Sequence, residues 1–111
     1  MAKKIINNRE LYCEVVYSKA KGRMTPVLLD MLLTIGSNLI VKFNFPNDDY
    51  KFDCLYYGHY RVLANWMEFN EIVYNNPFAY YTEIYKRAFA WQFNQLRHNH
   101  LRIDNLEYIN F

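Results

Sequence analysis

The chain is poor in the residues that interrupt or cross-link a fold. Its 111 residues include three glycines, three prolines and two cysteines. This scarcity, with almost no alternation of apolar and polar residues, argues against a turn-rich sheet protein and predicts an all-α fold. Cys13 and Cys54 lack the spacing of a metal site or a disulfide framework. We therefore expect two reduced thiols in the core of a cytosolic protein, with a disulfide between them as the alternative.

Membrane-spanning runs and catalytic motifs are also missing. The longest apolar stretch, residues 27–41, is broken by one aspartate and three other polar residues, which excludes a membrane span. The basic start leads into polar residues, so no secretory signal is expected. No phosphate-binding loop, dinucleotide fingerprint, nucleophile elbow or zinc-protease motif occurs, and the three histidines lack metal-ligand spacing. We expect neither an enzyme nor a bound metal or cofactor.

The chain is rich in aromatic residues and unevenly charged. It contains 11 tyrosines and eight phenylalanines, and 52% of its residues are hydrophobic, which predicts one domain with a folded core. Residues 1–29 carry six basic and two acidic side chains, and residues 43–71 carry two basic and five acidic ones. Residues 84–103 carry four basic side chains and no acid. This alternation of charge favours two different partners on neighbouring faces.

The pattern predicts four helices. The first begins at Asn7–Asn8, where Glu10 is placed for a capping box, and ends at Gly22. The second opens at Thr25–Pro26 and continues as an apolar core helix to Phe45.

The third predicted helix runs from Tyr50 to about Asn70, after an acidic cap at 47–49. Its expected buried stripe consists of Phe52, Leu55, His59, Val62, Trp66 and Phe69, widened by Tyr56 and Leu63. The opposite face carries Asp53, Tyr57, Arg61, Asn65 and Glu68, and two tyrosines away from the stripe indicate a partner surface. Gly58 in mid-helix is costly, so we expect another backbone to pack close to it.

The fourth predicted helix starts with an Asn76 cap and Pro77 and ends near Arg97. Its aromatic residues surround Lys86 and Arg87, and rings beside cations suit an unpaired nucleic-acid strand. The alternative is a helix packed on two sides of a small bundle, with solvated charges. We expect a helical domain over residues 1–98 and a tail over residues 99–111.

Several short motifs occur in an order and spacing typical of one family. Asp53 precedes Gly58 by five residues in the third predicted helix, and the segment 76–82 reads Asn-Pro-Phe-Ala-Tyr-Tyr-Thr. Arg87 follows, and the segments 7–11 and 42–45 contribute Asn-Asn-Arg-Glu-Leu and Lys-Phe-Asn-Phe. Over residues 7–98 the chain resembles region 2 of bacterial sigma factors, and most closely the late-transcription sigma factors of T-even-type phages.

This resemblance implies two binding surfaces. The third helix would dock on the β′ clamp helices of core RNA polymerase through Asp53, Tyr56, Tyr57, His59, Tyr60 and Leu63. The fourth helix would recognise and melt the −10 element of late promoters through Tyr81, Ile84, Tyr85, Lys86, Arg87, Trp91, Gln92 and Arg97. Tyr81 matches the ring that stacks on an unpaired base, whereas Ile84 and Tyr85 replace two tryptophans of the housekeeping sigma factors.

The resemblance also implies further partners and a location. The tail residues Ile103, Leu106, Tyr108 and Phe111 resemble in composition the sliding-clamp-binding end of phage late sigma factors. The alternative is a tail that folds back onto the bundle or stays loose. A coactivator is a further candidate partner. The protein would act in the cytoplasm of an infected bacterium. Two alternatives stay open: a sigma-like module that regulates RNA polymerase or another protein without contacting DNA, and a free-standing single-strand binder.

Overall fold

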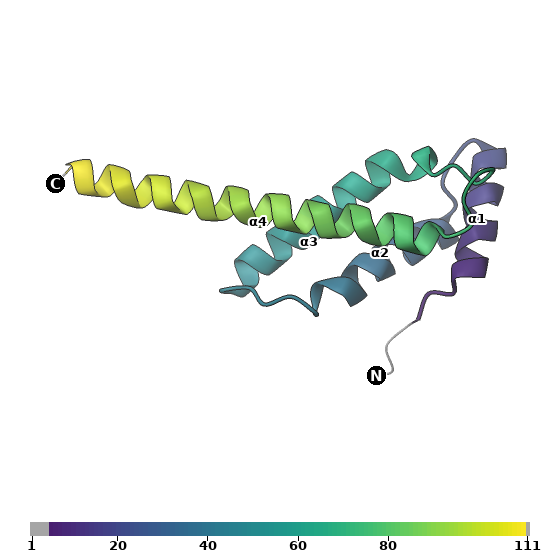
Figure 1. The fold of residues 1–111 in the computed structure, drawn as a ribbon, viewed down its shortest axis with the longest axis horizontal. Coiled ribbons are helices and arrows are strands. Elements are labelled where there is room, and N and C mark those ends of the chain that lie inside the picture. Colours follow the sequence, from purple (N-terminus) through teal and green to yellow (C-terminus); the bar gives the residue numbers. More distant parts are fainter. Residues whose placement is uncertain (1–4, 111) are drawn as a thin grey trace.

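Residues 5–110 form four α-helices and one short 3₁₀ helix (Figure 1). The computed structural model describes the backbone of these residues and the side chains of residues 5–98. The elements are α1 (Asn8–Lys21), α2 (Pro26–Ile40), α3 (Asp48–Asn65), the 3₁₀ helix η1 (Trp66–Glu68) and α4 (Pro77–Asn110). No strand occurs in this range, which confirms the predicted all-α class. None of the helices there combines the length and apolar character needed to cross a bilayer.

The first three helices begin at side-chain caps. Asn7 accepts a hydrogen bond from the amide of Glu10, Thr25 from that of Leu28, and Asn47 from that of Tyr50. Each cap satisfies an amide that has no partner within its helix and stabilises the helix by about 1 kcal/mol. At the other end of α1, Gly22 adopts φ 76°, the left-handed conformation that ends a helix at little cost in glycine. These caps confirm the predicted starts of α1 and α2, whereas α3 begins at Asp48, two residues before the predicted Tyr50.

The ends of three helices differ from the prediction. Helix α3 ends at Asn65, before the predicted end near Asn70, and η1 follows it. Helix α2 ends at Ile40 and not at Phe45, and the segment that follows packs Phe43 and Phe45 edge-on against Phe89 and Phe93. These aromatic contacts hold residues 41–45 outside the helix. Helix α4 has 34 residues and extends past the other helices (Figure 1), so the expected boundary between domain and tail at residue 98 lies inside it.

Helices α3 and α4 lie side by side, and α2 packs against both. The core between them contains two tyrosines, Tyr81 and Tyr85, which are fully buried. Helix α1 is tied to the segment before α4: the Lys19 ammonium group lies 2.6 Å from a Glu71 carboxylate oxygen, and the Tyr12 hydroxyl donates to the Glu71 carbonyl at 2.6 Å. The hydrogen bond from Lys19 lowers the pKa of Glu71.

Asn8 and Asn76 together fix the start of α4. The Asn8 side chain donates to the Asn75 carbonyl oxygen and accepts from the Phe78 amide, both at 3.1 Å. The Asn76 side chain accepts from the Ala79 amide at 3.0 Å. The first turn of α4 is therefore held from within the helix and from α1, which sets its position beside α3.

The two cysteines occupy different environments. Cys54 is buried, as predicted, and burial, with a smaller contribution from the Asp53 charge, raises its pKa to about 11. Cys13 is exposed, so its predicted place in the core is wrong. Helix α1 packs through Leu11 and Val15, and Cys13 lies midway between them on the outer side. Both thiols are free.

Candidate functional site

A groove of about 510 Å³ runs between α3 and α4. Its lining comes from one face of each helix: Tyr57, Arg61 and Asn65 from α3, and Tyr80, Ile84, Arg87, Ala88 and Trp91 from α4. Residues three and four apart share a helix face, so each set forms a continuous stripe along its helix. The two stripes meet because α3 packs along α4.

Stacked aromatic rings form one wall of the groove. The Tyr57 and Trp91 ring centroids lie 5.0 Å apart with an angle of 26° between the ring planes, an offset-stacked arrangement. Trp91 is 51% exposed, so half of the side chain stays open to solvent. Tyr57 thus orients the indole and leaves part of its surface available for a planar ligand group.

Two arginines supply positive charge to the groove. Arg61 makes no ion pair with any residue in the described part of the chain. The Arg87 Nε donates to Glu83 Oε1 at 3.1 Å, and these side chains are 80% and 54% exposed. An exposed pair of this kind contributes little to stability. Either guanidinium group is therefore available to a phosphate, which it would bind by charge-assisted hydrogen bonds.

Tyr81 and Tyr85 do not form part of this surface. Both side chains are 0% exposed. The Tyr81 hydroxyl donates to the Trp66 carbonyl and the Tyr85 hydroxyl donates to the Leu32 carbonyl, both at 2.8 Å. Burial raises the pKa of both hydroxyl groups. The structure contradicts the prediction that these rings stack on unpaired bases, because core side chains cover their faces.

The other residues expected to bind DNA are divided between two sides of α4. Ile84, Arg87 and Trp91 line the groove, whereas Lys86 lines a pocket between α2 and α4. Consecutive residues of a helix point about 100° apart, so Lys86 and Arg87 do not share one binding surface. Half-buried Gln92 and exposed Arg97 lie outside the groove lining.

The residues expected to bind polymerase also separate. Asp53, Tyr56 and Tyr60 are exposed on the outer face of α3, where Phe52 stacks on Tyr56 with ring centroids 6.4 Å apart. Tyr57 lies in the groove, and half-buried Leu63 packs against the core. The predicted buried stripe of the third helix is confirmed in part. Val62, Trp66 and Phe69 are buried and Leu55 and Leu63 pack against the core, whereas Phe52 and Tyr56 are exposed. The fully buried residues of α3 itself are Cys54, Gly58 and Val62.

His59 faces the core and not the outer surface. Its Nδ1 lies 2.8 Å from the Tyr85 hydroxyl oxygen. That hydroxyl gives its only proton to the Leu32 carbonyl, so His59 Nδ1 must carry the proton of this hydrogen bond. Burial lowers the pKa of His59. This half-buried hydrogen bond to Tyr85 gives His59 a structural role in joining α3 to α4.

This lowered pKa predicts that the protein loses stability on mild acidification. The unfolded chain binds a proton near pH 6.5, the ordinary pKa of histidine, before folded His59 does, so the free energy of unfolding falls as the pH drops below that value. Urea titrations between pH 7.5 and 5 measure this slope. His59→Gln is expected to flatten it, and the matched change at exposed His98 is expected to preserve it. Equal slopes in both variants would contradict the assignment.

The sequence interpretation missed three polar or aromatic residues of the groove: Arg61, Asn65 and Tyr80. The available signal was the matched spacing of Tyr57, Arg61 and Asn65 on one helix and of Tyr80, Ile84 and Trp91 on the next. The prediction hid this match because it placed Arg61 and Asn65 on the face opposite the buried stripe, away from the helix interface.

The remaining expectations concern the chain end and metals. The backbone of Ile103, Leu106 and Tyr108 belongs to α4, but their side chains lie outside the described residues, as does Phe111. Within the described part of the chain, no three histidine, cysteine or acidic side chains cluster in a way that would hold a metal ion. Comparisons of the chain with protein-family models, curated proteins and solved structures find no match.

Proposed function

We propose that this protein is a phage-type sigma factor that binds host core RNA polymerase and contacts the melted −10 element of late promoters in the bacterial cytoplasm. The observation that carries the proposal is the groove between α3 and α4. It combines a half-exposed indole with two available guanidinium groups, the groups that bind an unpaired strand. The order of motifs along the sequence, which resembles that of sigma factor region 2, is the reason for proposing promoter DNA as the strand and RNA polymerase as the partner.

The outer face of α3 is the proposed polymerase-binding surface. Phe52, Tyr56 and Tyr60 expose 46%, 65% and 63% of their surface there, beside Asp53. Exposed rings that follow one face of a helix favour a protein partner, because aromatic residues dominate the buried centres of protein interfaces. This surface replaces the predicted set that included His59 and Leu63.

The groove is the proposed contact for the unpaired strand. Trp91, oriented by Tyr57, would stack on a base, and Arg61 and Arg87 would hold the adjacent phosphates. Base stacking on one ring contributes about 1–3 kcal/mol. One ring and two cations are a small footprint, so we expect weak binding of DNA by the free protein and effective contact within the polymerase complex.

The test is reconstitution with purified bacterial core polymerase. Core polymerase should retain the protein in a pull-down, and an AT-rich late promoter should give run-off transcripts only when both are present. Retention without transcripts, even on a promoter melted in advance, would contradict the DNA-binding part of the proposal. Absence of retention would contradict the whole proposal.

Removing the two groove cations is predicted to abolish most promoter-dependent transcription. Arg61→Gln with Arg87→Gln deletes two phosphate contacts, so run-off product should fall by about tenfold or more, while retention by core polymerase stays unchanged. The salt dependence of single-strand binding should become shallower by about 1.4 in log–log slope, at about 0.7 for each contact.

Lys86→Gln is the matched control, because Lys86 neighbours Arg87 but lines the other side of α4. It should leave transcription near the parent level. If the control lowers transcription as much as the arginine variant does, net charge and not the groove determines the effect, and the assignment of the groove is wrong.

The burial of Tyr81 and Tyr85 favours a second candidate, a protein-interaction module that regulates polymerase without contacting DNA. In that case the outer face of α3 would be the whole functional surface. Tyr56→Ala with Tyr60→Ala should then remove all activity, and the arginine variant should remove none. Under the sigma proposal both variants lose transcription, but only the tyrosine variant loses core binding.

A further inference from the structure

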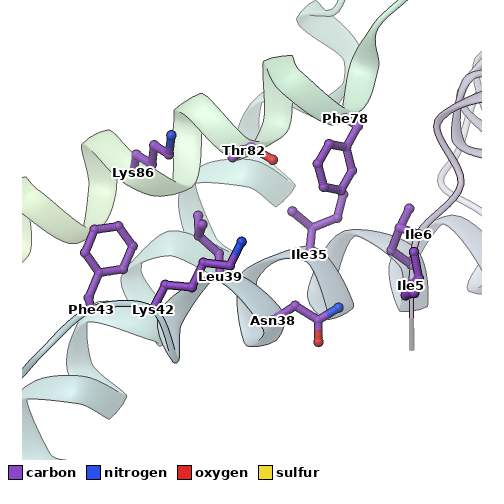
Figure 2. A pocket seen from close by; sticks show the side chains of 10 residues that line it. All are labelled: Ile5, Ile6, Ile35, Asn38, Leu39, Lys42, Phe43, Phe78, Thr82 and Lys86. Carbon is purple, nitrogen blue, oxygen red and sulfur yellow. The ribbon is translucent and has the colours of Figure 1, made fainter. Parts of the chain in front are cut away.

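A second cavity, of about 830 Å³, lies between α2 and α4, on the side of α4 away from the groove (Figure 2). The segment before α1 closes one end through Ile5 and Ile6. Its volume falls within the range of small-molecule sites, which are about 300–1,000 Å³. No step of the proposed function uses this pocket.

The pocket is apolar in its floor and along its rim. Ile35 and Leu39 of α2 form a floor that is 2% and 8% exposed. Phe43 and Phe78 flank it and leave 41% and 39% of their surface in contact with solvent. Covering these rings would remove apolar surface from water at about 25 cal/mol for each Å². An apolar ligand body therefore has a favourable place to bind.

Two cations line this apolar surface. Lys42 follows the end of α2, and Lys86 projects from α4 (Figure 2). Neither ammonium group forms an ion pair with a residue in the described part of the chain, and the described lining contains no carboxylate. An anionic group at the pocket would meet the positive charge of Lys42 and Lys86 and no carboxylate of the described lining, whereas a cationic group would be repelled.

The pocket lining also contains a hydroxyl group without a partner. Thr82 Oγ1 is shielded from solvent and has no hydrogen-bond partner among the described residues. A buried polar atom left unpaired costs free energy, and such atoms are rare in folded proteins. Because Thr82 lines the pocket, its unpaired hydroxyl is a candidate donor to an anionic oxygen bound there. This gives an anionic oxygen a third potential partner.

We propose that this pocket binds a small amphipathic anion: an aliphatic or aromatic body that carries one carboxylate or phosphate group. The apolar body would cover Ile35, Leu39 and Phe78, and the anionic group would lie within reach of Lys42 and Lys86. This site is separate from the strand-binding groove, and its occupancy does not depend on transcription activity.

Three ten-carbon probes that differ in their head group test the proposal: decanoate, decyl phosphate and decanol. Each is titrated into the full chain below its micelle-forming concentration, with isothermal calorimetry and amide NMR shifts as readouts. At least one anion should bind tenfold or more tightly than decanol and should shift the amides of Ile35, Leu39 and Thr82. The relative affinities of decanoate and decyl phosphate identify the preferred anionic group. Equal binding of decanol, or shifts confined to the α3–α4 groove, would overturn the proposal.

Charge-removal variants locate the anion. Lys42→Gln with Lys86→Gln should weaken binding of the preferred anion about tenfold and leave decanol binding unchanged. Lys51→Gln removes a lysine that lies outside the pocket lining and should retain the parent affinity. Both lysines of the pocket are exposed, so the double variant should fold, which its NMR spectrum verifies. Undiminished anion binding in the double variant would also overturn the proposal.

Discussion

Tyr85→Ala is expected to bring the protein close to unfolding. The Tyr85 ring is fully buried and contacts α2 and α3 from its position on α4, so its removal leaves a large cavity where three helices meet. Truncation of a large buried aromatic side chain costs about 3–5 kcal/mol. A domain of this size has a total free energy of unfolding of about 5–15 kcal/mol. The variant should therefore unfold at a much lower urea concentration, and at a much lower temperature, than the parent protein.

Urea unfolding followed by circular dichroism measures this loss, with Tyr60→Ala as the matched control. Tyr60 is 63% exposed on α3, and its truncation should change stability by no more than about 0.5 kcal/mol. Tyr85→Phe keeps the ring but removes the hydroxyl that bonds the Leu32 carbonyl and His59, so it should cost about 1–2 kcal/mol.

The same variants distinguish a packing role from a base-stacking role for Tyr85. A base-stacking ring would tolerate truncation in the free protein, and its loss would appear only in DNA binding. Suppose that the free energy of unfolding of Tyr85→Ala lies within about 1 kcal/mol of the parent value, and that the variant no longer binds a single strand. This result would contradict the burial seen in the structure and support a base-stacking role for Tyr85.

The features that the sequence predicted correctly are local ones. The caps at Asn7, Thr25, Asn47 and Asn76 each involve a side chain and an amide three residues later, so short stretches of sequence contain the information. The all-α class follows from the same kind of information. The predicted end of α2 at Phe45 was wrong. Phe43 and Phe45 pack on α4, and this contact between distant segments cannot be inferred from a short stretch of sequence.

The orientation of α3 about its axis was harder to predict for a different reason. The predicted stripe includes Phe52 and Tyr56, which the structure leaves exposed, whereas Cys54 and Gly58 are buried beside the stripe residue Val62. Small residues face α4 because Tyr85 and Phe89 fill the space between the helices. Complementarity between large and small residues is a property of a helix pair, so the periodicity of one helix does not reveal it.

The face of α3 that was predicted to meet α4 also affects the predicted binding site. The prediction places Arg61 and Asn65 away from α4 and assigns the aromatic residues of the deepest α4 face to a strand-binding surface. The structure instead uses Tyr81 and Tyr85 to join the helices and leaves Trp91 at the accessible edge. Tyrosine can serve in either place, because its hydroxyl group can bond water or a backbone carbonyl.

Gly36→Ala tests this packing directly and is expected to destabilise the protein by about 1–3 kcal/mol through overpacking. A Cβ atom at Gly36 would overlap Cε1 and Cζ of the Tyr85 ring. On the facing helix, a Cβ atom at Gly58 would lie 2.6 Å from Phe89 Cε1 and 2.7 Å from Tyr85 Cδ1, so Gly58→Ala should behave similarly. Aromatic side chains explain both glycines, and at Gly58 they occupy the place where the sequence predicts a close backbone. In an exposed helix the same substitution would stabilise by about 1 kcal/mol.

A double-mutant cycle isolates the contact between Gly36 and Tyr85. Tyr85→Leu removes the ring atoms that a Cβ at Gly36 would overlap, so in that background Gly36→Ala should change from destabilising to stabilising by about 0.5–1 kcal/mol. Ser37→Ala, an exposed change on the same helix, should have the same small effect in both backgrounds. If Gly36→Ala costs as much in the Tyr85→Leu background as in the parent protein, the destabilisation comes from elsewhere, and Tyr85 does not occupy the space between α2 and α3.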